Sequence, residues 1–522
     1  MSNRIGKVLL VTGSLAEDIV KRYSKESNVE TETLVLKTQV AAFLTPEIIV
    51  KNMESINLSG FSMILVPGLL RGDTSLITKA TGIETFKGPR YAADLPTVLD
   101  LLGQVPLSTV VPACELMHEK LVEKALEEIE KTEQNRDTLL EQPGNMLIGN
   151  LAVGKEFPMR ILAEIVDAAI MDTKTIRQLA QEFAAAGANI IDVGMVVGES
   201  RPEDAKSIVQ AVKQVVDVPV SIDTLDPAEI KAAVFAGADL VLSGDAGNIE
   251  EIASYVKDVA VVIIPTNQKQ GYFPKKVEER VRFMEETIAK AKKLGVTHVL
   301  ADLILEPTNI LESFMAFRQF AERNPSVPLF VGVSNVTELM DADSVGVNAL
   351  LARLSSEINA SVLLATEKSD KAKGTVAEEV AAAKMMFLAK KRGSVPKDLG
   401  IDLLILKDKR NHEEAYNNLM EQKAPVTMAE KVDAPELDAL GSFTIQLDRI
   451  GKTIVVLHYA SGKIETPDQI IKGKTADDIY MKIARSSFAS RKDHMAYLGA
   501  ELTKAEIALK TGKEYIQDAA LF

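Results

Sequence analysis

Two aspartates close short apolar segments in the middle of the chain. Asp192 follows Gly187-Ala-Asn-Ile-Ile, and Asp223 follows Val218-Pro-Val-Ser-Ile. Short apolar runs separated by a helical pattern are typical of buried parallel strands. A carboxylate at the end of such a strand lies where the strand leaves the core, which in a parallel barrel is the rim that carries binding and catalytic residues. We therefore expect both carboxylates to meet a ligand.

Most of the other predicted strands also end in polar residues. A single one of these could be the N-cap of the following helix, and that alternative stays open for each member. It explains Asn335 and Asp302 less readily than the others. A ring of such residues predicts a polar pocket. In chain order the strand ends carry Asp167, Asp192, Asp223-Thr224, Ser243-Gly-Asp245, Thr266-Asn267-Gln268, Asp302, Ser334-Asn335 and Thr366-Glu367-Lys368.

The residue types at these strand ends restrict the chemistry of the pocket. No strand end carries a histidine, and scattered carboxylates without histidine favour at most a loosely held Mg²⁺. We therefore predict no dedicated metal site. Without a histidine at the rim no Ser-His-Asp arrangement can be proposed either.

The elements that must position these residues form a repeating pattern of strand and helix over residues 151–395. Eight such pairs in just over two hundred residues predict a (β/α)8 barrel. Glycines of the Ala-Gly-Ala type, Gly187 and Gly237, mark helix ends just before two of the strands. The predicted strands lie near Arg160–Asp167, Asn189–Gly194, Val218–Asp223, Ala238–Ser243, Val259–Pro265, His298–Asp302, Leu329–Val333 and Ser361–Thr366.

Residues 1–150 predict a smaller α/β domain with a parallel sheet, because strand-like runs at Lys7–Thr12, Thr31–Lys37 and Phe61–Pro67 alternate with helical patterns. Open parallel sheets bind ligands beside the carboxyl ends of their strands. The basic residues that follow these strands could hold an anion, or could simply be solvated, and both interpretations stay open. They are Arg71, Lys87 and Arg90. No G-x-G-x-x-G or Walker A spacing indicates a nucleotide site.

Residues 396–522 predict a C-terminal α+β domain. Strand-like runs occur at Leu403–Leu406, Gly441–Leu447 and Thr453–His458, the last two as a hairpin, and two helical patterns follow. His494 lies on the second helical pattern. It is either part of an ordinary surface or interface helix, or a ligand of a corrinoid cobalt.

A chain of 522 residues predicts about three domains. Its composition excludes several classes of protein. Its net charge of −14 argues against a nucleic-acid binder, since nothing here would neutralise a phosphate backbone. A single cysteine, Cys114, excludes an internal disulfide framework, and no apolar stretch is long enough to span a bilayer. We expect a cytoplasmic protein that acts on small molecules.

The barrel segment, about Phe157–Arg392, resembles the pterin-binding family, which joins dihydropteroate synthases and methyltetrahydrofolate methyltransferases. The resemblance rests on the segments ending in Asp192 and Asp223 and on the motifs Glu199-Ser-Arg-Pro202 and Ala236-Gly-Ala-Asp-Leu-Val. It implies a reduced pterin in the barrel mouth, with its guanidine-like edge read by carboxylates.

On the family pattern Asp223 and Asp302 match the aspartates that hold the pterin, and Asp192 matches the carboxylate of the second strand. Asn335 lies in Gly332-Val-Ser-Asn-Val336, which resembles a methyltransferase motif whose asparagine hydrogen-bonds the pterin near N5. We predict that Asn335 is catalytic, because a side-chain amide can keep its hydrogen bond to N5 when the protonation of N5 changes. The remaining predicted pterin-binding residues are Asp167, Asp245, Asn267 and Ser334.

The chain departs from the synthase pattern at each element that handles the diphosphate. Ala163-Glu164 replaces the end of the first strand that carries an asparagine, Ser334-Asn335-Val336 replaces Ser-Arg-Lys, and Ala365-Thr366-Glu367 replaces Arg-x-His. These losses put diphosphate expulsion and a role for Mg²⁺ in doubt. The three-part layout resembles archaeal dihydropteroate synthase-related proteins, found also in organisms that use tetrahydromethanopterin.

This resemblance implies a group transferase acting on a reduced pterin of the tetrahydromethanopterin type, in the biosynthesis or metabolism of a one-carbon coenzyme. Two alternatives stay open: a methyltransferase from the pterin to a corrinoid, favoured by Asn335, and a pterin carrier or sensor without catalysis, favoured by the lost anion-handling residues. A corrinoid protein and a second copy of the chain are further candidate partners.

Overall fold

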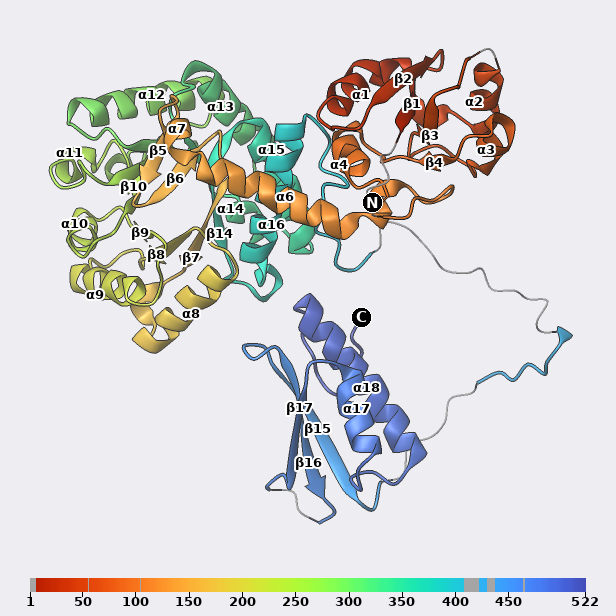
Figure 1. Cartoon of the computed structure of the whole chain (residues 1–522). Coiled ribbons are helices and arrows are strands. Elements are labelled where there is room, and N and C mark those ends of the chain that lie inside the picture. The colour runs from red at the N-terminus through yellow and green to blue at the C-terminus, as the bar shows by residue number, and fades with distance from the viewer. Residues whose placement is uncertain (1–5, 55, 104, 408–421, 430–436, 463–464) are drawn as a thin grey trace. The chain divides into compact units, whose positions relative to one another are not determined.

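The computed structural model describes residues 6–54, 56–103, 105–407, 422–429, 437–462 and 465–522. The chain forms two compact units, Met1–Leu403 and Leu404–Phe522 (Figure 1). The first unit contains both the N-terminal sheet and the barrel, and the domain boundaries near residues 150 and 395 stay predictions. None of the helices in the described part of the chain is long and apolar enough to cross a membrane.

The N-terminal sheet has four parallel strands in the order β2-β1-β3-β4. Alternate residues of β1 enter the cores on opposite faces, with Val8 and Leu10 on one side and Leu9 and Val11 on the other. This arrangement confirms the predicted parallel sheet. The elements are β1 (Lys7–Gly13), α1 (Glu17–Ser24), β2 (Thr31–Leu36), α2 (Pro46–Met53), β3 (Phe61–Val66), α3 (Ser75–Thr81), β4 (Thr85–Lys87) and α4 (Leu95–Asp100).

Three helices follow the sheet, α5 (Ala113–Leu116), α6 (His118–Gln134) and α7 (Arg136–Leu140). Arg160 anchors α6 to the barrel from the first residue of β7. Its guanidinium donates two hydrogen bonds to the Glu133 carboxylate, at 2.7 and 3.0 Å, and a third to the Ala152 carbonyl. This bidentate geometry fixes the helix more firmly than a single surface ion pair would.

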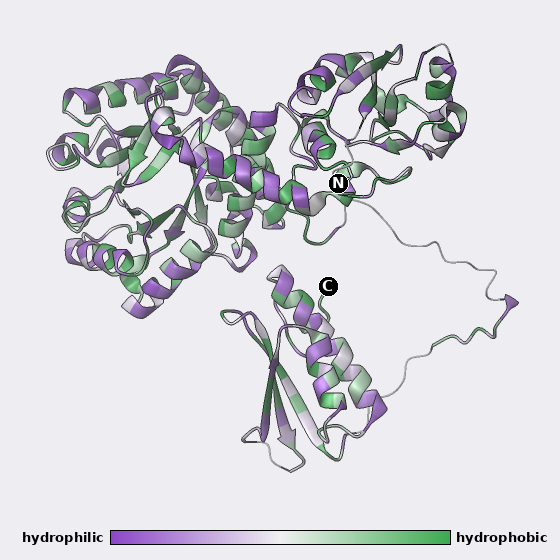
Figure 2. Ribbon diagram, viewed as in Figure 1, coloured by the Kyte–Doolittle hydropathy of each residue, from purple (hydrophilic) through white to green (hydrophobic). Residues whose placement is uncertain are grey.

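The central element is a closed barrel of eight parallel strands, as predicted. Helices surround the strands, and in Figure 2 hydrophobic and hydrophilic residues alternate along them, as expected for helices with one buried face. In chain order the barrel comprises β7 (Arg160–Ile165), α8 (Thr173–Ala185), β8 (Ile190–Gly194), α9 (Pro202–Lys213), β9 (Val220–Asp223), α10 (Pro227–Phe235), β10 (Leu240–Gly244), α11 (Ile249–Ile252), β11 (Ala260–Ile263), α12 (Val277–Lys293), β12 (Val299–Ala301), α13 (Ile310–Arg323), β13 (Leu329–Val331), α14 (Ser334–Thr337), α15 (Ser344–Glu357), β14 (Ala360–Thr366) and α16 (Thr375–Arg392).

A hairpin of β5 (Asn145–Ile148) and β6 (Leu151–Gly154) closes the end of the barrel at which the strands begin. Ile148 and Val153 of this hairpin are fully buried among the inward-facing residues of the barrel strands. The interior is therefore packed at the amino ends of the strands, and the polar residues at the carboxyl ends of the strands form the opposite rim.

The second unit is a three-stranded antiparallel sheet with two helices. It consists of β15 (Gly441–Asp448), β16 (Thr453–Ala460), β17 (Gln469–Gly473), α17 (Ala476–Ala484) and α18 (Lys492–Thr511). The predicted hairpin is β15 and β16, paired in register from Gly441 with Ala460 to Asp448 with Thr453. The core includes Phe443 and Ile454 of the sheet and Leu498 of α18.

The predicted strand at Leu403–Leu406 is wrong. These residues form no strand, and Leu404, Ile405 and Leu406 are 49 to 60% exposed. An apolar run forms a strand only where a neighbouring strand takes its backbone hydrogen bonds, and none of the described strands pairs with this segment.

Candidate functional site

Strand periodicity places the rim carboxylates inside the barrel. Leu162, Ile190 and Leu300 pack in the interior layer of the barrel. Because side chains alternate between the two faces of a strand, the residues two positions further on also point inward. Those residues are Glu164, Asp192 and Asp302.

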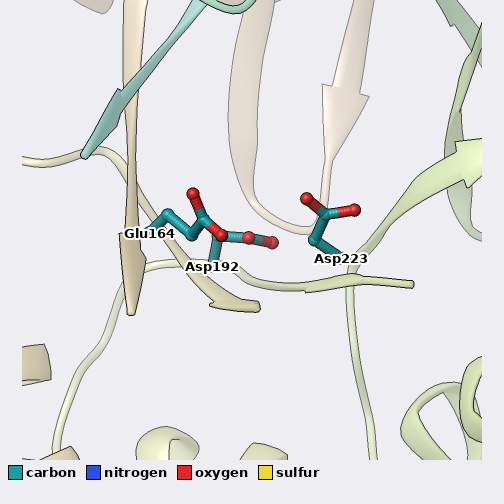
Figure 3. A group of neighbouring side chains, drawn as sticks. All are labelled: Glu164, Asp192 and Asp223. Carbon is teal, nitrogen blue, oxygen red and sulfur yellow. The ribbon is translucent and has the colours of Figure 1, made fainter. Parts of the chain in front are cut away.

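Three carboxylates from consecutive strands meet at one point of this rim. Glu164 of β7, Asp192 of β8 and Asp223 of β9 each offer an oxygen atom, and these oxygens all lie within 4.8 Å of one another. Figure 3 shows the Asp192 carboxylate between the carboxylates of Glu164 and Asp223. We call Glu164, Asp192 and Asp223 the carboxylate cluster.

Asp192 is the most buried member of the carboxylate cluster, with no exposed surface. Its Oδ1 accepts a hydrogen bond from the hydroxyl of Ser221, its register partner on β9. Its Oδ2 is buried and has no hydrogen-bond partner in the described structure. A buried carboxylate oxygen left without a donor is unfavourable, so this atom is suited to meet a ligand.

Burial and mutual repulsion favour the protonated forms of these acids. Burial raises the pKa of Glu164 to about 8, with added contributions from Asp223 and Asp167. It also raises the pKa of Asp223 to about 7 and that of Asp192 well above its usual value. Carboxyl groups with strongly raised pKa values at a barrel rim are typical of binding and catalytic sites.

Asp302 lies just beyond β12 and near the carboxylate cluster. Burial raises its pKa to about 7, and the charge of Asp223 raises it further. Its Oδ1 accepts the backbone N–H of Ile304 at 2.8 Å, which holds the side chain in place. Of the predicted pterin-binding residues, the structure thus brings together Asp192, Asp223 and Asp302.

Asn335 and Ser334 begin the short helix α14 and have different environments. Asn335 is exposed, and its Nδ2 donates to the Leu305 carbonyl at 3.3 Å. Its amide oxygen therefore stays available to a ligand. Ser334 is buried, and its hydroxyl oxygen accepts the backbone N–H of Thr366 at 2.7 Å, so it links two loops.

The other predicted rim residues bind the protein itself. Asp245 is 1% exposed and accepts from the Gly247, Asn248 and Gln268 backbones and from the Thr266 hydroxyl. The Asn267 side chain accepts from the backbone N–H of Gln270. These contacts order the loops after β10 and β11 and leave Asp245 no free acceptor position for a ligand.

Asp167 lies two residues beyond the end of β7, in the left-handed region at φ 53°. Its carboxylate pairs with Lys368 at 2.7 Å. Glu164, which was not among the predicted site residues, takes the inward position of this strand. The signal that could have revealed it is the two-residue period from Leu162, since Asp167 is out of phase with that period.

The predicted anion-binding residues of the N-terminal sheet occupy three different environments. Arg71 is exposed and lines an open pocket of about 550 Å³. Lys87, the last residue of β4, is 7% exposed, and burial lowers its pKa. Arg90 donates two hydrogen bonds to Glu115, so its charge is already partly neutralised. An anion site here stays a prediction.

In the second unit, the Nδ1 atom of His494 lies 3.1 Å from Asp438 Oδ2. Its ring packs 5.4 Å from the ring of Phe443. The contact with Asp438 fixes the orientation of the imidazole, as in many metal-ligating histidines, but equally suits an ordinary core contact. Cobalt ligation by His494 stays a prediction.

Comparison with known proteins agrees with this architecture. The model of the family described as pterin binding enzyme matches residues 164–384, from Glu164 to the middle of α16. A relative in Methanocaldococcus jannaschii, uncharacterized protein MJ0107, is 42% identical over 532 residues and covers 99% of both chains. The chain belongs to the pterin-binding enzyme family. This confirms the family predicted from the sequence.

Two further family models match outside the pterin-binding barrel. Residues 6–90 match a family of unknown function, DUF6513, and residues 437–518 match the family described as PterinBD-DUF4346. Among solved structures, dihydropteroate synthase of Yersinia pestis with a pterine-sulfa conjugate is 19% identical, covers 47% of this chain and 99% of its own, and has a TM-score of 0.39. The enzyme of Xanthomonas albilineans with 7,8-dihydropteroate is 19% identical, with coverages of 46% and 96% and a TM-score of 0.37.

Proposed function

We propose that the barrel binds a reduced pterin of the tetrahydromethanopterin type and acts as a group transferase in the biosynthesis or metabolism of a one-carbon coenzyme. The observation that supports this most is the convergence of Asp192, Asp223 and Asp302 at the inner rim of a pterin-binding family barrel. In this proposal Asp223 and Asp302 hold the pterin and Asp192 supports Asp223.

The chemistry of a pterin matches these acceptors. Its pyrimidine ring carries a ring N–H beside an exocyclic amine, and one carboxylate accepts both hydrogen bonds. Hydrogen-bond donors of the ligand would favour the ionised form of Asp302, which burial alone disfavours. Binding would therefore release a proton from a carboxyl group whose pKa lies near neutrality.

The first test is a binding assay of the full chain with a panel of reduced pterins, including tetrahydromethanopterin and tetrahydrofolate. Asp302→Ala should weaken binding by about 1.5–3 kcal/mol, because it removes a charge-assisted acceptor from the ligand donors. Asp343→Ala, a change on the loop before α15, is the matched control. If neither Asp302→Ala nor Asp223→Ala changed the affinity, the pterin would not lie at this rim.

A methyltransferase from the pterin to a corrinoid is the second candidate, and the placement of Asn335 favours it. The amide is exposed at the rim, with its oxygen available to a ligand. Lys368, whose charge acts on Glu164, is itself paired with Asp167. An acidic rim of this kind suits methyl transfer, in which the pterin is the leaving group and needs a proton at N5. It suits expulsion of diphosphate less well, because negative charge at the rim repels an anion.

A pterin carrier or sensor is the remaining alternative. It requires the same grip on the pterin and no second substrate. Transfer of a methyl group from a methylated tetrahydropterin to cob(I)alamin, or condensation of a pterin diphosphate with an arylamine, would separate the two enzymes from the carrier. Pterin binding without either reaction would favour the carrier.

A further inference from the structure

The outer edge of β15 in the second unit pairs with no described strand, because the order of this sheet is β15-β16-β17. Phe443 and Ile445 turn their side chains into the core, so Thr444 and Gln446 lie on the opposite face of the sheet. Aromatic and β-branched residues that alternate in this way favour a strand. The free edge of such a strand tends to pair with a strand of another chain.

The side chain of Gln517 occupies this edge. The backbone N–H of Ile445 donates to Gln517 Oε1 at 2.8 Å, and Gln517 Nε2 donates to the Phe443 carbonyl at 3.1 Å. A side-chain amide offers the same kinds of donor and acceptor as a peptide group. Gln517 therefore takes the place that one residue of a neighbouring strand would have beside β15.

Gln517 belongs to the segment after α18, residues 512–522, which forms no helix or strand and is mostly exposed. Side chains hold this segment to α18. Gln517 Nε2 also donates to the Tyr497 hydroxyl at 2.8 Å, and the Tyr515 hydroxyl donates to Glu501 at 3.0 Å. Each such hydrogen bond contributes only modestly to stability, so releasing the segment costs far less than unfolding the unit.

The sequence of β15 is complementary to itself in antiparallel pairing. When two copies of the strand pair about Ile445, Ile445 lies opposite its counterpart, and Phe443 lies opposite Leu447 on the face that bears the core. On the other face Thr444 lies opposite Gln446. These pairs bring apolar residues together and place no like charges opposite each other, so the strand itself favours pairing with a second copy.

We propose that the outer edge of β15 is a pairing surface for a second copy of this chain, and that Gln517 covers it. While Gln517 is bound, the N–H of Ile445 and the carbonyl of Phe443 are not available to another strand. When residues 512–522 leave the edge, two copies pair through β15 and form one continuous sheet. This inference goes beyond the proposed pterin function, because none of these residues lies in the barrel.

The test measures self-association by sedimentation velocity over a range of protein concentrations. Two variants open the edge: Gln517→Ala in the full chain, and a chain that ends at Gly512. Each should strengthen self-association by about tenfold or more, because backbone groups of β15 become free to bond a second copy. Hydrogen exchange of Gly441–Asp448 should slow as the concentration of either variant rises. Self-association equal to that of the unchanged chain in both variants, or exchange that does not depend on concentration, would overturn the proposal.

Added lysines test whether the copies meet at β15. Thr444→Lys together with Gln446→Lys, in the Gln517→Ala chain, places like charges opposite each other across the paired strands. Self-association should then return to that of the unchanged chain. Ile470→Lys in the same background is the matched control, because Ile470 is 51% exposed on β17, the other edge strand of the sheet. It should leave the pairing intact, and an equal loss in the control would overturn the proposal by showing that the copies meet elsewhere.

Discussion

Asp192 and Ser221 are register partners on β8 and β9, and the Ser221 hydroxyl donates a hydrogen bond to Asp192 Oδ1 inside the barrel. This contact orients a carboxylate that has no exposed surface, and it leaves the second oxygen of that carboxylate buried without a hydrogen-bond partner. The pairing of strands thus determines how the candidate site is oriented. It also shows why the apolar strands matter to the site, since their register brings the two side chains together.

Ser221→Ala should destabilise the barrel by about 1–3 kcal/mol, because it leaves both oxygens of a fully buried carboxylate without a donor. The measurement is urea unfolding of the ligand-free chain in chelator. Ser361→Ala is the matched control: Ser361 is a buried strand serine whose hydroxyl has no partner, so its loss should cost little. Equal effects of the two changes would mean that the Ser221 contact does not hold Asp192.

Asp302→Asn should stabilise the ligand-free chain at pH 8 and leave its stability unchanged near pH 4. Burial raises the folded-state pKa of Asp302 to about 7, whereas an unfolded aspartate titrates near about 3.9. Protonation therefore favours the folded state fully below pH 4, and this contribution is lost as the pH rises through 7. Asparagine does not titrate and keeps an oxygen for the Ile304 N–H.

We expect a gain of about 1–3 kcal/mol at pH 8 for Asp302→Asn, within the usual range for removal of a buried unpaired charge. Unfolding curves at pH 4, 6 and 8 measure it. A difference between the two proteins that stayed constant over this range would show that Asp302 does not titrate near neutrality. The same variant should bind pterin more weakly, which separates stability from binding.

The barrel and the aspartates at its rim could be predicted from sequence because both depend on local patterns. Apolar runs, the helices between them and the terminal carboxylates of Asp192 and Asp223 are visible in the chain itself. The β5–β6 hairpin and β17 were not predicted, since each is short and becomes a strand only by pairing with a partner strand.

The roles of individual polar residues depended on contacts that the sequence does not contain. Asp245 and Asp302 both follow an apolar strand, yet Asp245 accepts hydrogen bonds from its own loop and the next, while Asp302 stays close to Asp223. Glu164 was missed because the strand ends at Ile165, two residues before the aspartate that marked its predicted end. Phase along the strand, rather than residue type, decides which side chain enters the pocket.

A pterin diphosphate should bind the chain no more tightly than the same pterin with a free hydroxymethyl group. The rim is acidic, and Lys368 is engaged by Asp167. Competition titrations in metal-free buffer measure the ratio of the two affinities. A preference for the diphosphate of about tenfold, roughly 1.4 kcal/mol, would show that basic residues elsewhere reach the ligand. Loss of that preference in Arg71→Ala or Lys87→Met would identify the N-terminal sheet as their source.

Asn335→Ala should separate the three candidate functions. If the amide serves N5 during methyl transfer, its interaction is stronger in the transition state than with the bound pterin, so turnover should fall by about 10²-fold while pterin affinity changes much less. A carrier has no transition state to stabilise, and its variant would lose affinity alone. A condensing enzyme acts at the methylene on C6 rather than on N5, so both losses would be small.

The measurement compares methyl transfer from a methylated tetrahydropterin to cob(I)alamin with equilibrium binding of the same pterin, for the unchanged chain and for Asn335→Ala. Leu339→Ala is the matched control, since Leu339 lies just beyond α14, is 74% exposed and should affect neither quantity. The corrinoid is supplied both free and bound to a corrinoid protein, because the protein around the cobalt alters how the cobalt accepts the methyl group. If the unchanged chain transferred no methyl group in either form, Asn335 would have no N5 chemistry to serve, and condensation or carriage would be left.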